Sequence, residues 1–341
     1  MPRRSFYINE AELDEYQVQV IQRRTDRSFI VKGCAGSGKS ILALWKVKQI
    51  QEEKMGSYYF IVFTKTLKQY MRDGIRTIGL RDDRVLHYKQ WADREGYPSA
   101  DYIVVDEAQD FNAEQISAFR RSARKALLLY GDSAQQLYNF KVPPPLSMEQ
   151  IMAQTGFPNE QLVFNHRLPK KIARFAQYLS ETDDELELRC RNEGTELPKI
   201  LKYPSLDAQL DAIAQIIKAR NFQDVGVLLP LNEQVEHAFK YLIKKGVNAE
   251  RKSREGMDLN FTSDNVKIIT YHSAKGLQFE AVFIPNCNVN EADKRVSLYV
   301  AITRTYQSLY IMHSGDLSTF FDIIPSNLYE TSLAVQAGVR L

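Results

Sequence analysis

Residues 33–40 read Gly-Cys-Ala-Gly-Ser-Gly-Lys-Ser and fit the spacing G-x-x-x-x-G-K-[ST]. The stretch follows the apolar run Ser28–Val31 and opens the helical pattern Ile41–Glu53. Glycines let a backbone curl so that several N–H groups face one anion at the start of a helix. Strand, glycine loop and helix in this order predict a phosphate-binding loop in an α/β fold. A glycine-rich turn without a ligand is the alternative.

Two side chains carry the chemistry expected of this loop. A lysine at position 39 adds a point charge to the β- and γ-phosphates, and a serine at position 40 offers its hydroxyl to Mg²⁺. The expected phosphate-contacting residues are Gly33, Gly36, Ser37, Gly38, Lys39 and Ser40.

Two acidic residues, Asp106 and Glu107, come directly after the apolar run Tyr102–Val105. The carboxyl ends of parallel strands open onto the ligand crevice of an α/β sheet. An aspartate there can hold Mg²⁺ through water, and a neighbouring glutamate can orient and deprotonate the attacking water. An acidic helix N-cap is the alternative. Beside the phosphate loop, the pair favours a catalytic reading.

Short β-branched runs alternate with helical patterns along most of the chain, which predicts parallel sheets covered by helices on both faces. The expected strands are Ser28–Val31, Tyr58–Phe63, Tyr102–Val105, Ala126–Leu129, Gly226–Leu229, Val266–Thr270, Ala281–Ile284 and Ser308–Met312. The expected helices include Ile41–Glu53, Met148–Ala153, Asp207–Ala219 and Glu233–Lys244. Three consecutive prolines at 143–145 mark a break, and we place the boundary between two domains, 1–157 and 158–341, shortly after it.

Composition narrows the class of protein. The 341 residues suit two domains, and 45 basic against 42 acidic residues give a net charge of +3. Such a balance excludes a nucleic-acid-binding protein whose affinity relies on a large excess of positive charge, but it does not exclude a local basic groove. Three distant cysteines argue against a disulfide framework and a CxxC metal site. Without a signal peptide or a run long enough to cross a bilayer, we expect a cytoplasmic protein with no membrane partner.

Seven further segments, in chain order, resemble the motifs of UvrD/Rep-like superfamily 1 helicases. They are Leu13–Gln17, Phe63–Lys65, Gly131–Lys141, Asn165–Arg167, Thr270–Phe279, Tyr299–Arg304 and Leu317–Pro325. The resemblance covers nearly the whole chain and implies two tandem RecA-like P-loop domains. It further implies ATP and Mg²⁺ as cofactors, and a motor that runs 3′ to 5′ on single-stranded DNA, with RNA less favoured.

The resemblance implies roles for residues around the nucleotide. Gln17 stands where the family reads adenine, and His166 stands where the family has a tyrosine stacked on adenine. Gln278, after Gly276, replaces a glutamate that bonds the ribose, so it keeps an acceptor but loses the charge.

The resemblance implies three more catalytic residues. Gln135 is expected to bond the γ-phosphate or the attacking water. Arg167 and Arg304, from the second domain, are expected to act as arginine fingers, because a guanidinium is planar and always charged.

Aromatic and polar residues are expected on the DNA side, where bases stack on aromatic rings and phosphates meet polar groups. Phe140 is the main stacking candidate, and plain core packing is the alternative for each aromatic residue, for Phe63 above all. The full set is Phe63, Thr64, His87, Tyr138, Phe140, Lys141 and His272.

The chain departs from UvrD-like enzymes in having no room for their two accessory domains. Only residues 92–100 and 251–265 stand in the corresponding places, and neither segment can hold a domain. We therefore expect a bare tandem core, with a protein partner in place of the accessory domains. An ATP-driven switch acting on a partner protein is the alternative function; a small-molecule P-loop kinase is disfavoured by the two arginine motifs.

Overall fold

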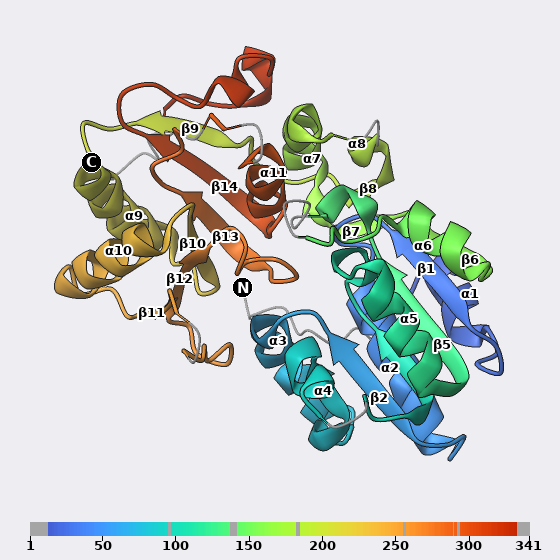
Figure 1. Cartoon of the computed structure of the whole chain (residues 1–341). Helices are drawn as coiled ribbons and strands as arrows, with labels where there is room; N and C mark the ends of the chain where they lie inside the picture. The colour runs from blue at the N-terminus through green and yellow to red at the C-terminus, as the bar shows by residue number, and fades with distance from the viewer. Residues whose placement is uncertain are drawn as a thin grey trace. The chain divides into compact units, whose positions relative to one another are not determined.

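The computed structural model describes residues 13–94, 97–136, 142–181, 185–254, 257–288, 290–291 and 294–332, without the side chains of residues 73 and 77. The helices (Figure 1) are α1 (Glu15–Gln22), α2 (Lys39–Glu52), α3 (Lys65–Thr77), α4 (Tyr88–Ala92), α5 (Ala113–Ser122), α6 (Met148–Thr155), α7 (Lys170–Ala176), α8 (Leu186–Arg189), α9 (Leu206–Arg220), α10 (Asn232–Lys244) and α11 (Arg295–Ile302). The strands are β1 (Phe29–Gly33), β2 (Tyr58–Val62), β3 (Val85–His87), β4 (Ala100–Val105), β5 (Ala123–Gly131), β6 (Asn159–Leu162), β7 (Asn165–Pro169), β8 (Cys190–Asn192), β9 (Lys199–Lys202), β10 (Val225–Leu229), β11 (Ala249–Lys252), β12 (Val266–Thr270), β13 (Phe279–Ile284) and β14 (Thr305–His313).

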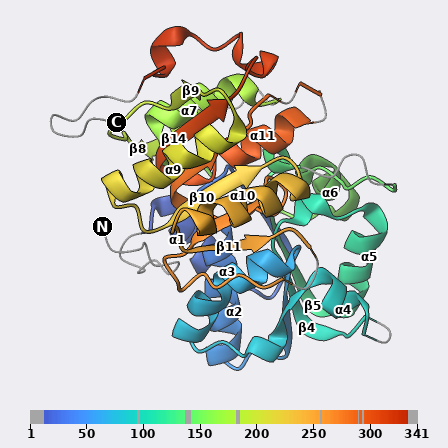
Figure 2. The same ribbon diagram turned by 90° about the vertical axis from the view of Figure 1, so that its left-hand side faces the viewer.

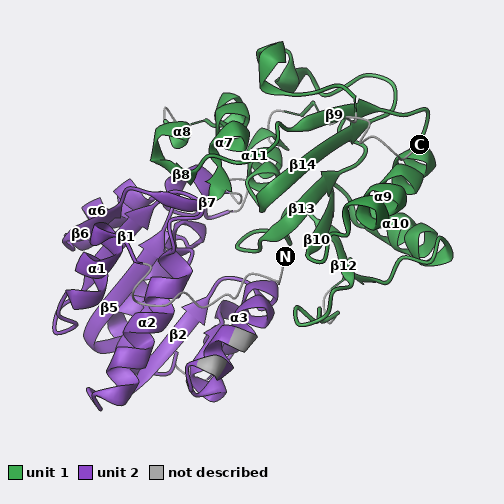
Figure 3. Ribbon diagram, turned by 180° about the vertical axis from the view of Figure 1, so that it is seen from behind, with its two compact units in different colours: residues 1, 167–341 green, residues 2–166 purple. Residues whose placement is uncertain are grey.

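The chain divides into two compact units, which we call the N-terminal unit (residues 2–166) and the C-terminal unit (residues 167–341; Figure 3). The division therefore falls after His166 rather than at residue 157, where the sequence placed it. Strand β6 is the reason, because it pairs in parallel with β1 and joins the first sheet. The proline-rich stretch precedes α6, whose Met148 and Ile151 are buried in the core of the N-terminal unit.

The sheet of the N-terminal unit has the strand order β3-β2-β4-β5-β1-β6, and all its pairs are parallel. Side chains alternate between two cores. Helices α2 and α3 supply buried residues to one face of the sheet, and α4, α5 and α6 supply them to the other. Because every strand runs the same way, β1, β4 and β5 all end at one edge.

The sheet of the C-terminal unit has the order β11-β12-β10-β13-β14-β9 and is also parallel. Helices α9 and α10 lie side by side on one face (Figures 1 and 2) and bury their apolar residues there. Strands β7 and β8 form a separate two-stranded sheet.

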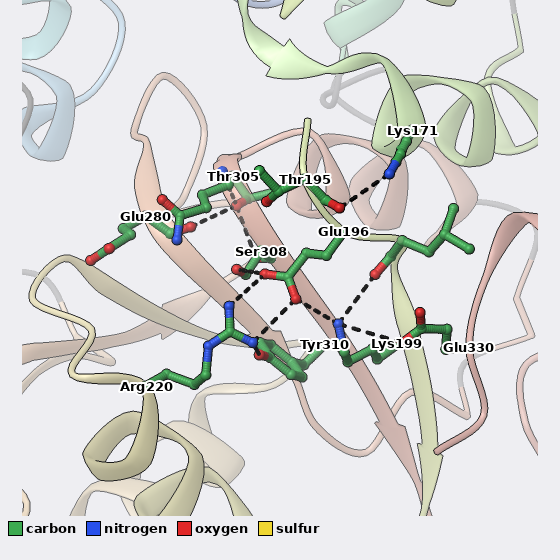
Figure 4. A network of polar contacts seen from close by, with 12 residues as sticks. Lys171, Thr195, Glu196, Lys199, Arg220, Glu280, Thr305, Ser308, Tyr310 and Glu330 are labelled. Atoms are coloured by element: carbon green, nitrogen blue, oxygen red, sulfur yellow. Dashed lines mark hydrogen bonds and ion pairs between the residues drawn. The ribbon is translucent and has the colours of Figure 1, made fainter. Parts of the chain in front are cut away.

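A polar network fastens the edge strand β9 to this sheet (Figure 4). The carboxylate of Glu196 accepts from Lys199 Nζ at 2.6 Å and from Arg220 Nη2 at 3.0 Å, and it also accepts from Ser308. The backbone of Glu330 pairs with residues 198 and 200, on the far side of β9. The network thus joins β9, α9 and β14 with charged hydrogen bonds.

The fold class predicted from the sequence is confirmed, and all eight expected strands are present, β12 with the predicted ends and the other seven with shifted ends. Six strands escaped the sequence analysis: β3, β6, β7, β8, β9 and β11. They are short, and β11, Ala-Glu-Arg-Lys, has no buried residue, so it carries no apolar pattern to detect.

Two findings bear on the expectations from composition. In the ranges given above, no helix is long and apolar enough to span a membrane. Cys34, Cys190 and Cys287 are all buried, and none of the three forms a disulfide. The cytoplasmic location stays a prediction.

Candidate functional site

The predicted phosphate loop connects the end of β1 to the start of α2. Gly36 and Gly38 have φ angles of 77° and 88°, in the left-handed region that favours glycine. A Cβ atom on Gly36 would lie 2.3 Å from Asn165 Oδ1, and one on Gly38 would lie 2.7 Å from Gln17 Nε2. The close approach of these side chains therefore requires glycine at both positions.

Lys39 points back into the loop. Its side chain is buried, and Nζ donates to the carbonyl oxygens of Gly33 at 2.7 Å and Cys34 at 2.9 Å. The same Nζ lies 3.9 Å from Asp132 Oδ2. The ammonium group is therefore held by weak acceptors that the oxygens of a phosphate could replace.

Asp106, which directly follows β4, fits a magnesium site shared with Ser40. Its side chain is fully buried, and Oδ1 accepts from the backbone N–H of Glu107 at 3.0 Å. Burial, and then the charge of Glu107, raise the pKa of Asp106, while a hydrogen bond with Ser40 and the charge of Lys39 oppose the rise. Mg²⁺ keeps several waters and binds through one or two carboxylates, so a buried carboxylate beside a serine hydroxyl suits it. Within the described ranges, no group of three or more His, Cys, Asp and Glu side chains converges on another metal position.

Gln109, which the sequence analysis did not assign, joins the ends of β4 and β5. Its Nε2 donates to Glu107 Oε2 at 2.5 Å, and its Oε1 accepts from the backbone N–H of Asp132 at 2.9 Å. Asp132 in turn accepts from Gln135 Nε2 at 2.5 Å. A Cβ atom on Gly131 would lie 2.6 Å from Gln109 Oε1, so the bridge also depends on a glycine. The sequence signal that could have pointed to Gln109 is its place within the acidic stretch Asp-Glu-Ala-Gln-Asp, two residues after Glu107.

Gln17 and His166, expected at adenine, both lie beside the phosphate loop. Gln17 Nε2 donates to the carbonyl oxygen of Ser37 at 3.0 Å, and Gln17 Oε1 accepts from the N–H of Asp14 at 3.1 Å. His166 Nε2 lies 2.6 Å from Asp14 Oδ2, and its backbone N–H donates to the carbonyl oxygen of Gly36 at 3.2 Å. These contacts place both residues at the flank of the loop, and base recognition stays a prediction.

The predicted residues of the C-terminal unit belong to several elements. Arg304 is buried beyond the end of α11, where Nε donates to the carbonyl oxygen of Val300 at 2.8 Å and Nη2 donates to Thr303 Oγ1 at 3.0 Å. Arg167 is a half-buried residue of β7. The turn between β12 and β13 contains His272, Gly276, which has a φ angle of 78°, and Gln278.

Three of the predicted DNA contacts lie at the carboxyl edge of the N-terminal sheet, and each has a structural contact as well. Thr64 caps α3, its Oγ1 accepting from Leu67 N at 3.1 Å, and His87 caps α4. Phe63 packs edge to face on Phe111, with ring centroids 5.1 Å apart, which agrees with the core-packing alternative. Tyr138, Phe140 and Lys141 lie outside the described residues.

A pocket in the C-terminal unit was also missed by the sequence analysis. It has a volume of about 540 Å³ and lies beyond the carboxyl ends of β10 and β13. Its lining consists of Pro230, Leu231, Gln234, Asn288, Asn290, Glu291 and Lys294. The lining thus combines apolar surface with amide groups and one charge of each sign.

Comparison with known families agrees with this geometry. Residues 17–141, which hold the phosphate loop and the carboxylate pair, match the family described as an AAA domain. Residues 265–312, from β12 to β14, match the family described as a UvrD-like helicase C-terminal domain. The chain is a relative of the UvrD-like helicases. The resemblance drawn from the motifs is thereby confirmed.

Relatives of this UvrD-like chain are known as DNA helicases. A "Probable DNA helicase" from Mycoplasma pneumoniae is 27% identical over 237 residues, which are 63% of this chain and 44% of that protein. A "Probable DNA helicase II homolog" from Rickettsia conorii is 32% identical over 88 residues, which are 21% of this chain and 13% of that protein. The UvrD-like chain thus spans less than half the length of these relatives. The solved PRRSV helicase is similar over 87% of this chain and 54% of that chain, with 18% identity and a TM-score of 0.49.

Proposed function

We propose that this chain is an ATP-dependent motor, a translocase or helicase, that acts on single-stranded DNA. One observation supports the proposal most: the polar network that runs from Lys39 through Asp132 to Gln135 and through Gln109 to Glu107. Every member comes from the carboxyl edge of one parallel sheet, where α/β proteins bind nucleotides.

The N-terminal unit would bind ATP and prepare the water for attack. Lys39 would exchange the loop carbonyls for phosphate oxygens, and Ser40 and Asp106 would hold Mg²⁺, which neutralises charge on the β- and γ-phosphates when bound. Glu107 would orient the attacking water and accept its proton. Because Gln109 holds one carboxylate oxygen of Glu107 and the backbone of Asp132, it would keep the base aligned with the loop that carries Gln135.

We further propose that Arg167 and Arg304 stabilise charge on the transferring phosphoryl group. For Arg304 this requires exchange of its bonds to Val300 and Thr303 for phosphate oxygens. The exchange gives the residue two states, one bound to its own helix and one bound to nucleotide.

The nucleic-acid part of the proposal rests on the names of the relatives and on the motifs. Single-stranded DNA would contact Phe140 and the neighbouring predicted residues, and the pocket beyond β10 and β13 is a second candidate contact. A 3′ to 5′ direction and a protein partner are parts of the same proposal.

The test is ATP hydrolysis by the purified chain, measured with single-stranded DNA, with RNA and with neither. We expect hydrolysis that depends on Mg²⁺ and increases at least about tenfold with single-stranded DNA, because binding both ligands orders one site. Phe140→Ala should lower that stimulation severalfold. Hydrolysis that no nucleic acid changes would favour the ATP-driven switch, and no hydrolysis under any condition would contradict both functions.

A further inference from the structure

Tyr130, near the end of β5, carries a hydroxyl that the mechanism above does not use. The side chain is 0% exposed, and among the described residues its hydroxyl has no hydrogen-bond partner. Burying a hydroxyl without a partner is unfavourable, and folded proteins seldom do so without a functional reason. A phenylalanine would fill the same space without this penalty, so the hydroxyl itself needs an explanation.

The register of the sheet places Tyr130 beside Asp106. Strands β4 and β5 pair in parallel with Val105 opposite Leu129, so the next residue on each chain, Asp106 and Tyr130, are neighbours. Side chains alternate along a strand. The residues two positions earlier on both strands, and Tyr130 itself, belong to the core face that α2 covers. Asp106 therefore points to the same face as Tyr130, under the helix that follows the phosphate loop.

Asp106 has an unused acceptor at this place. Its Oδ1 accepts from the N–H of Glu107 and Ser40 also bonds the carboxylate, but Oδ2 itself has no hydrogen-bond partner in the described part of the chain. Burial, and then the charge of Asp106, raise the pKa of Tyr130, which agrees with the neighbouring places of the two residues in the sheet. A donor without an acceptor and an acceptor without a donor thus lie under one helix.

We propose that Tyr130 is a positioning residue for Asp106: its O–H donates to one water molecule, and that water donates to Asp106 Oδ2. The two groups are not bonded directly, and one water has the protons and lone pairs to join them. The link would fix the orientation of the carboxylate when Mg²⁺ and nucleotide bind. The inference rests on the proposed function, because that function assigns Asp106 to the metal ion.

The test compares Tyr130→Phe with Tyr102→Phe in the full chain. Tyr102 is a matched control, because it is buried on the same core face near the other end of β4. Thermal stabilisation by ADP is measured while Mg²⁺ is titrated, and ADP binding is measured separately in EDTA. This readout needs no catalytic turnover.

We expect Tyr130→Phe to raise the Mg²⁺ concentration for half-maximal stabilisation by about tenfold, the usual scale for losing a bond that orients a metal ligand. Its ADP affinity in EDTA should match that of the parent. Its unfolding temperature without ligand should be equal or higher, because an unsatisfied hydroxyl is gone. Tyr102→Phe should leave the Mg²⁺ midpoint unchanged.

Four outcomes would count against these assignments, and they are distinguishable. An unchanged Mg²⁺ midpoint in Tyr130→Phe, or an equal shift in Tyr102→Phe, would overturn the inference and leave Tyr130 a core residue. An equal loss of ADP affinity in EDTA would also overturn it, because the hydroxyl would then act on the loop. A parent chain that binds no ADP with Mg²⁺ would instead refute the nucleotide site itself.

Discussion

Among single residues, Lys39 is the one whose substitution tests catalysis most clearly without disturbing the fold. Its ammonium group donates to loop carbonyls, which are weak acceptors. Water can replace the ammonium group at these carbonyls, so a shorter side chain should leave the sheet intact. Lys39→Ala should therefore lower ATP turnover by about a hundredfold or more, the scale for a charge that acts on the transition state. Steady-state phosphate release measures the effect, and circular dichroism checks the fold. A variant that keeps near-parent turnover would remove this loop from the mechanism.

Glu107→Gln tests the proton acceptor at the same edge. The amide keeps the size and one acceptor but cannot take a proton, so turnover should fall by about a hundredfold or more. ATP affinity should stay close to that of the parent, because the phosphates are held by the loop. Single-turnover hydrolysis and equilibrium binding are measured on the same preparation. Loss of binding together with turnover would mean that Glu107 supports the loop rather than the water.

Arg304 should affect the rate more than the affinity. Its bonds to Val300 and Thr303 hold it in the nucleotide-free chain, so the charge acts only after the side chain changes partners. We expect Arg304→Ala to reduce kcat by about a hundredfold while the Kd for ATP changes little. Arg254→Ala, an exposed arginine of the same unit, is the control. A change in Kd alone would contradict the role at the phosphoryl group.

At the scale of elements, parallel pairing decides where the site forms. Strands β1, β4 and β5 are distant in sequence but adjacent in the sheet, so the loop, the carboxylates and the glutamine segment meet at one edge. The amino-terminal ends of strands carry groups that stabilise the fold instead. In the C-terminal unit these include Glu196 and its partners (Figure 4).

Glu196→Gln should destabilise the C-terminal unit without touching the nucleotide site. Lys199 is 6% exposed, so losing the opposite charge leaves a buried cation with Glu330 at 3.7 Å as its remaining carboxylate. Breaking a buried ion pair costs about 3–5 kcal/mol of unfolding free energy. Because Glu330 partly replaces the lost carboxylate, we expect a loss of about 2 kcal/mol.

Urea unfolding of the full chain measures that loss. Glu193→Gln is the matched control, because Glu193 pairs with Lys170 at the surface, where such pairs contribute less than about 1 kcal/mol. ADP affinity should be the same in both variants. Equal stability of the two variants would show that the network of Glu196 adds nothing beyond a surface pair.

At the scale of the whole molecule, short connections stand at the two places where the sequence analysis expected no accessory domain. Seven residues, 93–99, join α4 to β4, and residues 253–265 join β11 to β12. We expect the purified chain to move on single strands but to separate long duplexes poorly. Opening each base-pair step costs about 1.4 kcal/mol of stacking, and a motor must also hold the junction between steps.

Two assays on the purified chain check this expectation. One follows displacement of an end-bound block from single-stranded DNA, and the other follows strand separation of a long tailed duplex. Displacement without separation is the expected result. Efficient separation by a monomer would contradict it, and failure of both assays despite active ATP hydrolysis would favour the ATP-driven switch.

The sequence by itself determined the fold class, and it predicted the phosphate loop and the carboxylate pair. These features are local: glycines at left-handed positions, apolar runs of strand length and acidic residues directly after a strand can all be read from neighbouring positions. The ordered motifs extended the prediction to the family, which the comparisons bear out.

Only the tertiary structure decided what lies next to each of these features. It assigned polar β6 to the first sheet and so moved the division to residue 166, and it showed Gln109 between Glu107 and Asp132. It also showed Arg304 bonded to its own helix. For β6 and Gln109 the physical reason is the same: strand pairing and the bond to Asp132 depend on groups that folding brings together from distant positions, and no periodicity in the chain encodes those partners. The partners of Arg304 are near in sequence, but its side chain bonds them in a buried position that only the folded unit creates.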